Sequence, residues 1–392
     1  MIFVIDSLVG AGAEKSLITL LSSIDHSKYS IDLMLFAHGE LLESLLPEEI
    51  NILKPLKYTE FSNMNLKNSL IYSIRKFNFR MLYSRIKYSV NIRSKKYSNP
   101  QKARLYWEAV SSVIEKNHKE YDIAISYAQG IPTFYVADKI TAKKKFAWVN
   151  VSYRLDNKER DFQAEYYKCY EKIVAVSDST KKIFLETFPF YNEKINVMYD
   201  INNPDLLKEM AENGVGYEDN FEGLRILTIG RLAHQKGYDI ALKTCRLLKE
   251  KGINFKWYVL GKGPLKFEIE KYIRNYNLEN HIKLLGVNAN PYPFIKGCDI
   301  YVQTSKFEGF GLAIAEARSL NKPVVTTRFD SVYSQMIDGK NGLVVDMNED
   351  AVYHGILRLI NDKELKENII NYLIKEKKGN IEEIEKFYKM VD

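Results

Sequence analysis

The chain has 392 residues, 46% hydrophobic and 12% aromatic, a composition that excludes a disordered protein and predicts about two folded domains. Its three cysteines and six histidines are few and scattered. This excludes a disulfide framework and zinc-ligand spacing, and favours a reducing, cytoplasmic setting. The net charge is +7, and no apolar run reaches the roughly 18 residues that a membrane-spanning helix needs.

Short apolar runs alternate with amphipathic helical runs, a pattern that predicts parallel sheets covered by helices. The first series of expected strands is 2–5, 31–35, 50–53, 123–126, 146–149 and 173–176, and the second is 224–229, 257–260, 282–284, 300–303, 324–326 and 343–345. A turn-rich stretch at 199–205 separates the two series. We therefore predict an α/β fold in which residues 1–202 and 203–375 form Rossmann-like domains that face a central cleft. A final helix within 376–392 is expected to pack back on the first domain.

Most of the excess of positive over negative charge lies in one stretch of the first half. From Phe61 to Trp107 the chain has eleven basic residues and no acidic one, and aromatic residues such as Phe77 and Tyr83 alternate with the cations. Such a stretch can lie on an anionic membrane surface, or it can be an ordinary helix pair with solvated lysines, and the sequence leaves both interpretations open. No RNA- or DNA-binding motif accompanies it, so no nucleic-acid partner is predicted.

Loops that follow strands of the second series carry residues suited to phosphate. Arg231 comes directly after the strand at 224–229, and Lys236 precedes the next helical run. The first offers a planar fork to phosphate oxygens and the second offers a point charge. A tight turn, Gly261-Lys262-Gly263, follows the next strand, and Leu284-Leu285-Gly286 ends the one after it. These loops predict one anion-binding edge of the second sheet.

The segment 307–316 holds the most informative pattern in the chain. Glu308 and Glu316 bracket a turn that contains Gly309 and Gly311, and a helix-forming run begins inside that bracket. Glycines let the backbone approach a ligand, and the free N–H groups at a helix start suit a phosphate. Carboxylates suit hydroxyl groups, so the segment predicts a nucleotide-sugar site.

Together these motifs resemble a known family. The order and spacing of Gly230-Arg231…Lys236-Gly237, Gly261-Lys262-Gly263, Leu284-Leu285-Gly286 and Glu308…Glu316 resemble the donor half of retaining GT-B glycosyltransferases of the family-4 type. The resemblance continues through 341–344 and covers the first half more loosely, at 8–15, 121–126 and 173–177. Bacterial capsule, exopolysaccharide and O-antigen transferases are the most similar members. A GT-B architecture is therefore expected.

The resemblance implies an activity and its partners. The enzyme would move a hexose or N-acetylhexosamine from a nucleotide-sugar, with UDP expected as the carrier, to a glycan or lipid-linked acceptor in surface polysaccharide synthesis. Retention of configuration is implied, and no cofactor or metal is expected, since the chain has no Asp-x-Asp triplet. The enzyme would be cytoplasmic and could meet the inner face of the membrane through residues 61–107. Two alternatives stay open: a non-catalytic GT-B subunit, and a nucleotide-sugar epimerase or phosphorylase.

Carried over position by position, the resemblance also assigns roles. Arg231 and Lys236 would hold the departing diphosphate, Glu308 would contact the transferred sugar, and Glu316 would accept hydrogen bonds from ribose. The other implied donor-site positions are Gly12, Gly309, Phe310, Gly311 and Leu312, whose backbone would approach the phosphates and sugar. Many relatives place a histidine after the strand at 146–149, whereas this chain has Asn150, a residue that can position a sugar but carries no charge.

Overall fold

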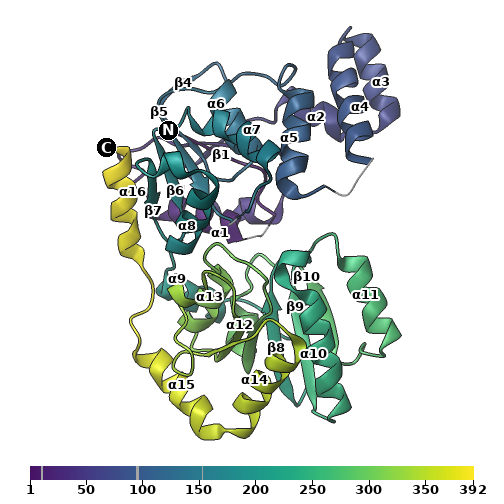
Figure 1. Cartoon of the computed structure of the whole chain (residues 1–392), viewed down its shortest axis with the longest axis vertical. Helices are drawn as coiled ribbons and strands as arrows, with labels where there is room; N and C mark the ends of the chain where they lie inside the picture. The colour runs from purple at the N-terminus through teal and green to yellow at the C-terminus, as the bar shows by residue number, and fades with distance from the viewer. Residues whose placement is uncertain (10–11, 94–96, 152) are drawn as a thin grey trace.

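Two parallel β-sheets, one in each half of the chain, organise the protein (Figure 1). The structure is a computed structural model that describes residues 1–9, 12–93, 97–151 and 153–392. Each sheet is covered by helices, and the two domains lie one above the other in the view of Figure 1. The prediction of an α/β fold with two Rossmann-like domains is confirmed.

The N-terminal sheet has the strand order β3-β2-β1-β4-β5-β6-β7, and its neighbours pair in parallel. Central strand β1 reads Ile-Phe-Val-Ile and is buried along its whole length, as expected for a strand covered on both faces. The strands are β1 (Ile2–Ile5), β2 (Asp32–Leu35), β3 (Asn51–Ile52), β4 (Glu120–Ser126), β5 (Thr141–Val149), β6 (Lys172–Ala175) and β7 (Ile195–Val197).

Two features of this sheet were not predicted. Strand β7 is missing from the expected series because its three residues show no periodicity, and its pairing with β6 defines it. Strand β5 begins five residues earlier than expected, since three consecutive lysines at 143–145 look like a loop in sequence. The helices of this domain are α1 (Gly12–Ser23), α2 (Lys57–Asn63), α3 (Leu66–Arg75), α4 (Phe79–Arg93), α5 (Asn99–Val110), α6 (Ile131–Lys139), α7 (Asn157–Tyr167) and α8 (Asp178–Thr187).

The C-terminal sheet has the order β10-β9-β8-β11-β12-β13, also parallel. Its strands are β8 (Leu224–Ile229), β9 (Phe255–Leu260), β10 (Ile282–Gly286), β11 (Ile300–Gln303), β12 (Val324–Thr327) and β13 (Leu343–Val345). Its helices are α9 (Pro204–Glu212), α10 (Tyr238–Glu250), α11 (Lys266–Asn275), α12 (Tyr292–Gly297), α13 (Leu312–Ser319), α14 (Glu349–Asn361) and α15 (Lys363–Lys375).

The last helix, α16 (Ile384–Val391), returns to the N-terminal domain (Figure 1). Phe387 is fully buried there, and its ring stacks on that of Phe3 with 6.2 Å between centroids. The ring of Tyr388 stacks on that of Tyr29 at 6.0 Å. The amphipathic helix therefore completes the core of the first domain although it follows the second in sequence.

In both sheets the strand order reverses next to the first strand of the domain. The reversal lies between β1 and β4 in the first sheet and between β8 and β11 in the second. At such a point the loops leaving the carboxyl ends of neighbouring strands diverge and leave a crevice. The loops after β1, β8 and β11 therefore belong to two crevices that can share one ligand.

Candidate functional site

A cavity of about 250 Å³ lies where these loops meet, and both domains line it. The structure brings all of the sequence-predicted site residues to this one cavity: Gly12, Asn150, Arg231, Lys236, Glu308, Gly309, Phe310, Gly311, Leu312 and Glu316. They come from loops more than 300 residues apart in the chain. Their individual roles stay predictions, and the geometry below shows what each can do.

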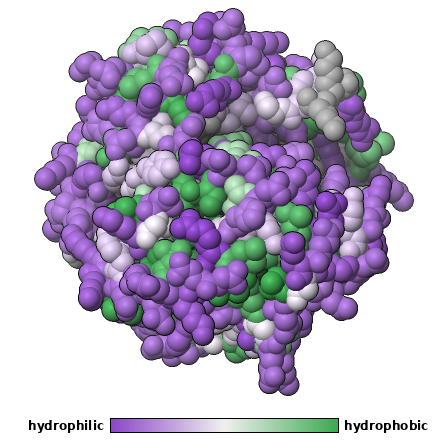
Figure 2. Space-filling model, turned by 60° about the horizontal axis from the view of Figure 1, so that its bottom comes forward, coloured by the Kyte–Doolittle hydropathy of each residue, from purple (hydrophilic) through white to green (hydrophobic). Residues whose placement is uncertain are grey.

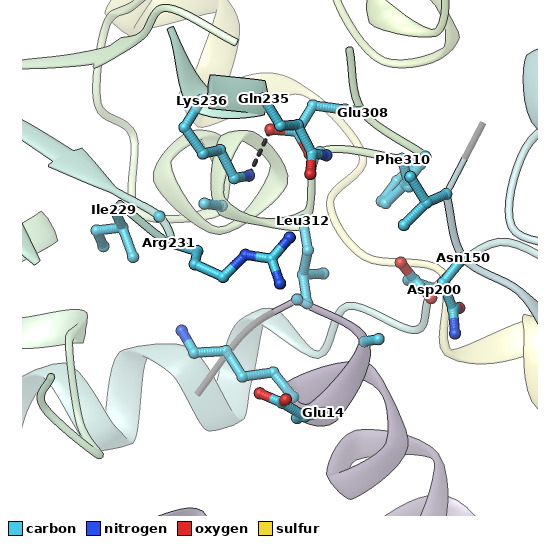
Figure 3. A pocket seen from close by; sticks show the side chains of 18 of the residues that line it. Glu14, Asn150, Asp200, Ile229, Arg231, Gln235, Lys236, Glu308, Phe310 and Leu312 are labelled. Carbon is cyan, nitrogen blue, oxygen red and sulfur yellow. Dashed lines mark hydrogen bonds and ion pairs between the residues drawn. The ribbon is translucent and has the colours of Figure 1, made fainter. Parts of the chain in front are cut away.

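Arg231 is the available cation of the site. It follows β8 directly, its side chain is exposed, and in Figure 3 its guanidinium points toward the middle of the cavity. The neighbouring backbone is fixed, because the Leu232 N–H donates to the Lys262 carbonyl at 3.0 Å. Among the residues that the structure describes, none forms an ion pair with Arg231. Its guanidinium is therefore available to an incoming anion.

Lys236 and Glu308 form an ion pair on the opposite wall of the cavity (Figure 3). Glu308 is 7% exposed, and the Ser305 hydroxyl donates to its Oε1 at 2.5 Å. The Gln303 amide approaches the same oxygen at 3.4 Å. Over the described ranges no donor reaches Oε2 of Glu308. One carboxylate oxygen is thus held by protein groups while the other can accept a hydrogen bond from a ligand hydroxyl.

Glu316 takes part in a contact between the domains. Lys15, on α1 of the N-terminal domain, approaches its two carboxylate oxygens at 3.4 and 3.5 Å, and both side chains are nearly buried. The Tyr292 hydroxyl donates to Oε1 at 3.0 Å. Burial, and secondarily the charge of Glu316, raises the pKa of Tyr292 well above its usual value, so this hydroxyl keeps its proton. A ligand hydroxyl that binds Glu316 must share the carboxylate with Lys15.

Two helix starts face the cavity. Helix α13 begins at Leu312, directly after Gly311, whose φ of 85° is a backbone conformation that favours glycine. Helix α1 begins at Gly12, and its first four residues line the same cavity. The first N–H groups of a helix have no acceptor within it, and they carry partial positive charge. Both ends therefore suit an anionic ligand.

Gly309 lies where the backbones of the two domains come close together. A Cβ placed on it would lie 2.1 Å from the backbone oxygen of Asn150, so only glycine fits there. Its own carbonyl accepts a hydrogen bond from the Ser177 hydroxyl at 2.8 Å. On the other side of the loop, the Gln335 amide donates to the carbonyls of Phe310 and Gly311 at 2.5 and 3.2 Å. The loop that precedes α13 is therefore fixed from both domains.

Asn150 and Asp200 line the N-terminal side of the cavity (Figure 3). The Asn150 amide nitrogen donates to the Tyr127 carbonyl at 2.6 Å, and its Oδ1 is buried without a partner in the described part of the chain. Such an oxygen can accept a ligand hydroxyl. Burial raises the pKa of Asp200 to about 6, although the Ser16 hydroxyl, which donates to it at 2.5 Å, acts in the opposite direction.

Sequence reasoning assigned no role to several residues that shape this site. Lys15 lies in the quoted glycine loop, and a cation one helical turn from a glycine-rich helix start was its available signal. Ser305 and Ser177 each follow a strand of the sheets, but serines in that position are common and gave no specific signal. Gly10 and Ala11 of the same glycine loop lie outside the described residues. Within the described residues, no cluster of three or more histidine, cysteine, aspartate or glutamate side chains could hold a metal ion.

Comparison with known proteins agrees with this geometry. Residues 218–376, which contain Arg231, Lys236, Glu308 and Glu316, match the family "Glycosyl transferases group 1". These residues form a group 1 glycosyltransferase domain. The domain carries most of the candidate site, and the N-terminal domain contributes Gly12, Lys15 and Asn150 from outside the matched region.

Curated relatives are similar over part of their length. An uncharacterised glycosyltransferase of Methanocaldococcus jannaschii is 27% identical over 260 residues, which cover 58% of this chain and 64% of that protein. A Campylobacter jejuni N-acetylgalactosaminyltransferase, named for a diphospho-undecaprenol substrate, is 27% identical over 202 residues, or 51% of this chain and 53% of that protein. The matches thus span between about half and two thirds of these relatives.

Solved structures match the whole chain in fold. Anabaena HepE in complex with UDP-glucose has a TM-score of 0.67 at 17% identity, and the match covers 99% of this chain and 98% of HepE. Staphylococcus aureus TarM in complex with UDP has a TM-score of 0.66 at 15% identity, with 100% and 99% covered. These similarities show a GT-B fold, as predicted. No helix in the described ranges is long and apolar enough to span a membrane.

Proposed function

We propose that this chain is a retaining, metal-independent glycosyltransferase that moves a hexose or N-acetylhexosamine from a nucleotide-sugar to a glycan or lipid-linked acceptor in surface polysaccharide synthesis. The observation that carries the proposal is the Arg231 guanidinium, which forms no ion pair within the described residues and shares one cavity with Lys236 and two helix N-termini. Lys15 and Lys236 are held by Glu316 and Glu308, so the Arg231 guanidinium and the helix ends are the positive groups left to meet an anionic ligand, although the carboxylates of Asp6, Glu14 and Asp200 also line the cavity. A diphosphate is the ligand that this arrangement fits.

The chemistry follows from the charge that develops during transfer. When the bond between the anomeric carbon and the phosphate oxygen breaks, the electron pair stays on the diphosphate and the sugar becomes oxocarbenium-like. Fixed cations and helix-end N–H groups stabilise that departing charge and lower the barrier. The acceptor hydroxyl attacks the face from which the phosphate leaves, and the phosphate oxygen takes its proton. Because attack and departure take place on the same face of the sugar, the configuration is retained without a protein nucleophile.

The two carboxylates have separate roles in this proposal. Oε2 of Glu308 accepts a hydrogen bond from a hydroxyl of the transferred sugar, while Lys236 and Ser305 donate to Oε1. Glu316 accepts the ribose hydroxyls, and Lys15 moves from that carboxylate toward the diphosphate as the donor enters. When the donor binds, Glu316 therefore exchanges Lys15 for the ribose hydroxyls and Lys15 exchanges Glu316 for the diphosphate. Neither buried charge is left without a partner.

The choice of partners rests on the relatives. HepE was crystallised with UDP-glucose and TarM with UDP, which supports UDP as the carrier. The Campylobacter relative is named for a diphospho-undecaprenol substrate, and a capsular polysaccharide glycosyltransferase of Staphylococcus aureus is 25% identical over 209 residues. We therefore propose an acceptor linked to a polyprenyl diphosphate or a growing surface glycan, with the enzyme at the cytoplasmic face of the membrane.

The test begins with a thermal-shift screen of UDP-, GDP- and ADP-sugars, since a ligand that binds only the native state raises its apparent stability. The sugar that gives the largest shift is then incubated with a lipid-linked acceptor, with and without a chelator. Nucleoside diphosphate release is measured, and the anomeric configuration of the product is read by NMR. The proposal is supported if nucleoside diphosphate is still released in the presence of chelator and if a donor with an axial anomeric bond gives a product whose new glycosidic bond is also axial. Conversion of the donor sugar without acceptor identifies an epimerase, and no shift with any donor contradicts the proposal.

A further inference from the structure

Helices α3 and α4 form a hairpin that projects from the N-terminal domain, away from its sheet (Figure 1). Residues 66–90 hold nine of the 21 large apolar side chains that are exposed in the described part of the chain. The most exposed are Phe77 (86%), Tyr83 (69%), Leu66 (65%) and Val90 (62%). By contrast, the face of the molecule in Figure 2 is mostly hydrophilic, with separate apolar patches. Exposed apolar surface is therefore concentrated on this hairpin.

The inner side of the hairpin combines small polar residues with Met81, which is buried, and with Tyr72, Leu82 and Tyr88, which pack partly buried against the domain core. Ser69 and Ser73 on α3 and Ser84 on α4 are buried. The Ser73 hydroxyl donates to the Ser69 carbonyl at 2.8 Å, and the Arg85 guanidinium donates to the Ser69 hydroxyl. A helix pair in water normally buries its large apolar residues and exposes its polar ones. Small residues between helices and large apolar residues outside are the arrangement found for helices that pack in lipid.

The turn between α3 and α4 also exposes large apolar side chains. Phe77, between α3 and α4, has a φ of 49°, a backbone conformation that is costly for a bulky residue, and its ring contributes nothing to the protein core. Phe79 follows at 54% exposure. Two aromatic rings therefore form an exposed tip. The helices have only 10 and 15 residues, or about 15 and 22 Å at 1.5 Å per residue, too short to cross a bilayer core of about 30 Å.

The positive charge around the tip of the hairpin indicates an anionic partner. Exposed cations surround the tip, including Arg75, Lys76 and Arg80, and no acidic residue occurs from Phe61 to Trp107. A second copy of the chain would bring two sets of like charges together, which costs free energy at an interface. Phospholipid headgroups supply the opposite charge, and the acyl region below them accepts apolar rings. An anionic membrane surface satisfies both features at once.

We propose that the α3–α4 hairpin inserts its aromatic tip, Phe77 and Phe79, into the headgroup region of an anionic bilayer, while the surrounding cations bind lipid phosphates. The inserted part is the outer face of residues 66–90, a narrower region than the basic stretch 61–107, whose Phe61, Arg104 and Trp107 are buried. Lys95 and Lys96 of that stretch lie outside the described residues. The inference concerns where the protein works and stands independently of the proposed sugar transfer.

The experiment measures co-flotation of the full chain with vesicles of phosphatidylcholine alone or with one third phosphatidylglycerol. The test variant is Phe77→Ser with Phe79→Ser. Its matched control is Phe190→Ser with Phe267→Ser, two phenylalanines that are 62% and 68% exposed elsewhere. We expect the wild type and the control to float with the anionic vesicles and the tip variant to bind at least tenfold more weakly. The melting temperature should be unchanged, because the removed rings are exposed.

A second pair of variants tests the charge. Arg75→Gln, Lys76→Gln and Arg80→Gln together should weaken anionic-vesicle binding, whereas the same exchange at the exposed Lys251, Lys271 and Arg274 should not. A tryptophan at the tip, Phe79→Trp, should shift its emission to the blue when vesicles are added. Absence of wild-type binding to anionic vesicles, or equal binding by the tip variant and the control, overturns the proposal. Dimers in vesicle-free solution that the tip variant abolishes would also overturn it and identify a second copy as the occupant.

Discussion

Replacement of Arg231 by alanine should separate catalysis from stability. Its guanidinium points into the cavity and makes no ion pair among the described residues, so the folded state loses little when it is removed (Figure 3). Exposed substitutions of this kind change stability by about 0.5 kcal/mol or less. One fixed charge-stabilising group at a transition state contributes about 3–4 kcal/mol. We therefore expect turnover of Arg231→Ala to fall by about 10²- to 10³-fold with an unchanged melting temperature.

Lys236→Met should behave differently because this lysine already has a partner. Its loss leaves the nearly buried Glu308 carboxylate with only the neutral Ser305 and Gln303 donors. Removing one partner of a fully buried pair costs about 3–5 kcal/mol, and because this pair is partly exposed we expect about 1–3 kcal/mol. Adding Glu308→Gln to Lys236→Met should restore stability by removing the unpaired charge, while turnover stays low.

The assay follows nucleoside diphosphate release at saturating donor, together with thermal melting of each variant. Arg274→Ala is the control, since this arginine is exposed on α11 and does not line the cavity. It should match the wild type in both measurements. Unchanged turnover in Arg231→Ala would refute the assignment of this cation to the departing diphosphate. If the melting temperature of Arg231→Ala fell as far as that of Lys236→Met, the claim that the Arg231 guanidinium has no ion-pair partner among the described residues would be refuted.

Three further changes test other parts of the site. Gly309→Ala places a Cβ 2.1 Å from the Asn150 carbonyl oxygen, so the domains must separate there, and we expect turnover to fall at least tenfold while each domain stays folded by circular dichroism. Glu316→Gln should weaken nucleotide binding about tenfold to a hundredfold in calorimetry, because hydrogen bonds to a charged group contribute about 1.5–3 kcal/mol; an unaltered affinity would remove it from the ribose site. Asp200→Asn should raise stability at pH 7, since the native carboxyl pKa of about 6 lies above the ordinary aspartate pKa of 3.8 and the wild type therefore loses stability as pH rises between them. Melting curves from pH 4 to 7 that run parallel for both proteins would contradict this.

The sequence by itself determined the fold class and the residues that make up the glycine-rich turn before α13. Apolar runs such as 224–229 and 300–303 are buried on both faces of a parallel sheet, so their continuous hydrophobicity identifies them without tertiary information. Glu308, Gly309 and Gly311 are close in sequence, and a short turn followed by a helix fixes their relation through local geometry. Arg231 is likewise determined locally, because it follows a strand directly.

Only the tertiary structure decided what reaches these residues from the other domain. Lys15 and Glu316 are separated by 301 positions, and no local rule predicts that they pair. The same holds for Ser177 and Gly309, since their contact depends on how the two sheets face each other. The hairpin shows this limit again: alternating charged and apolar residues at 66–90 are compatible with either face turned inward. Packing alone placed Ser69, Ser73 and Ser84 inside and the rings of Phe77, Phe79 and Tyr83 outside, because the side that a helix buries depends on the neighbour it meets.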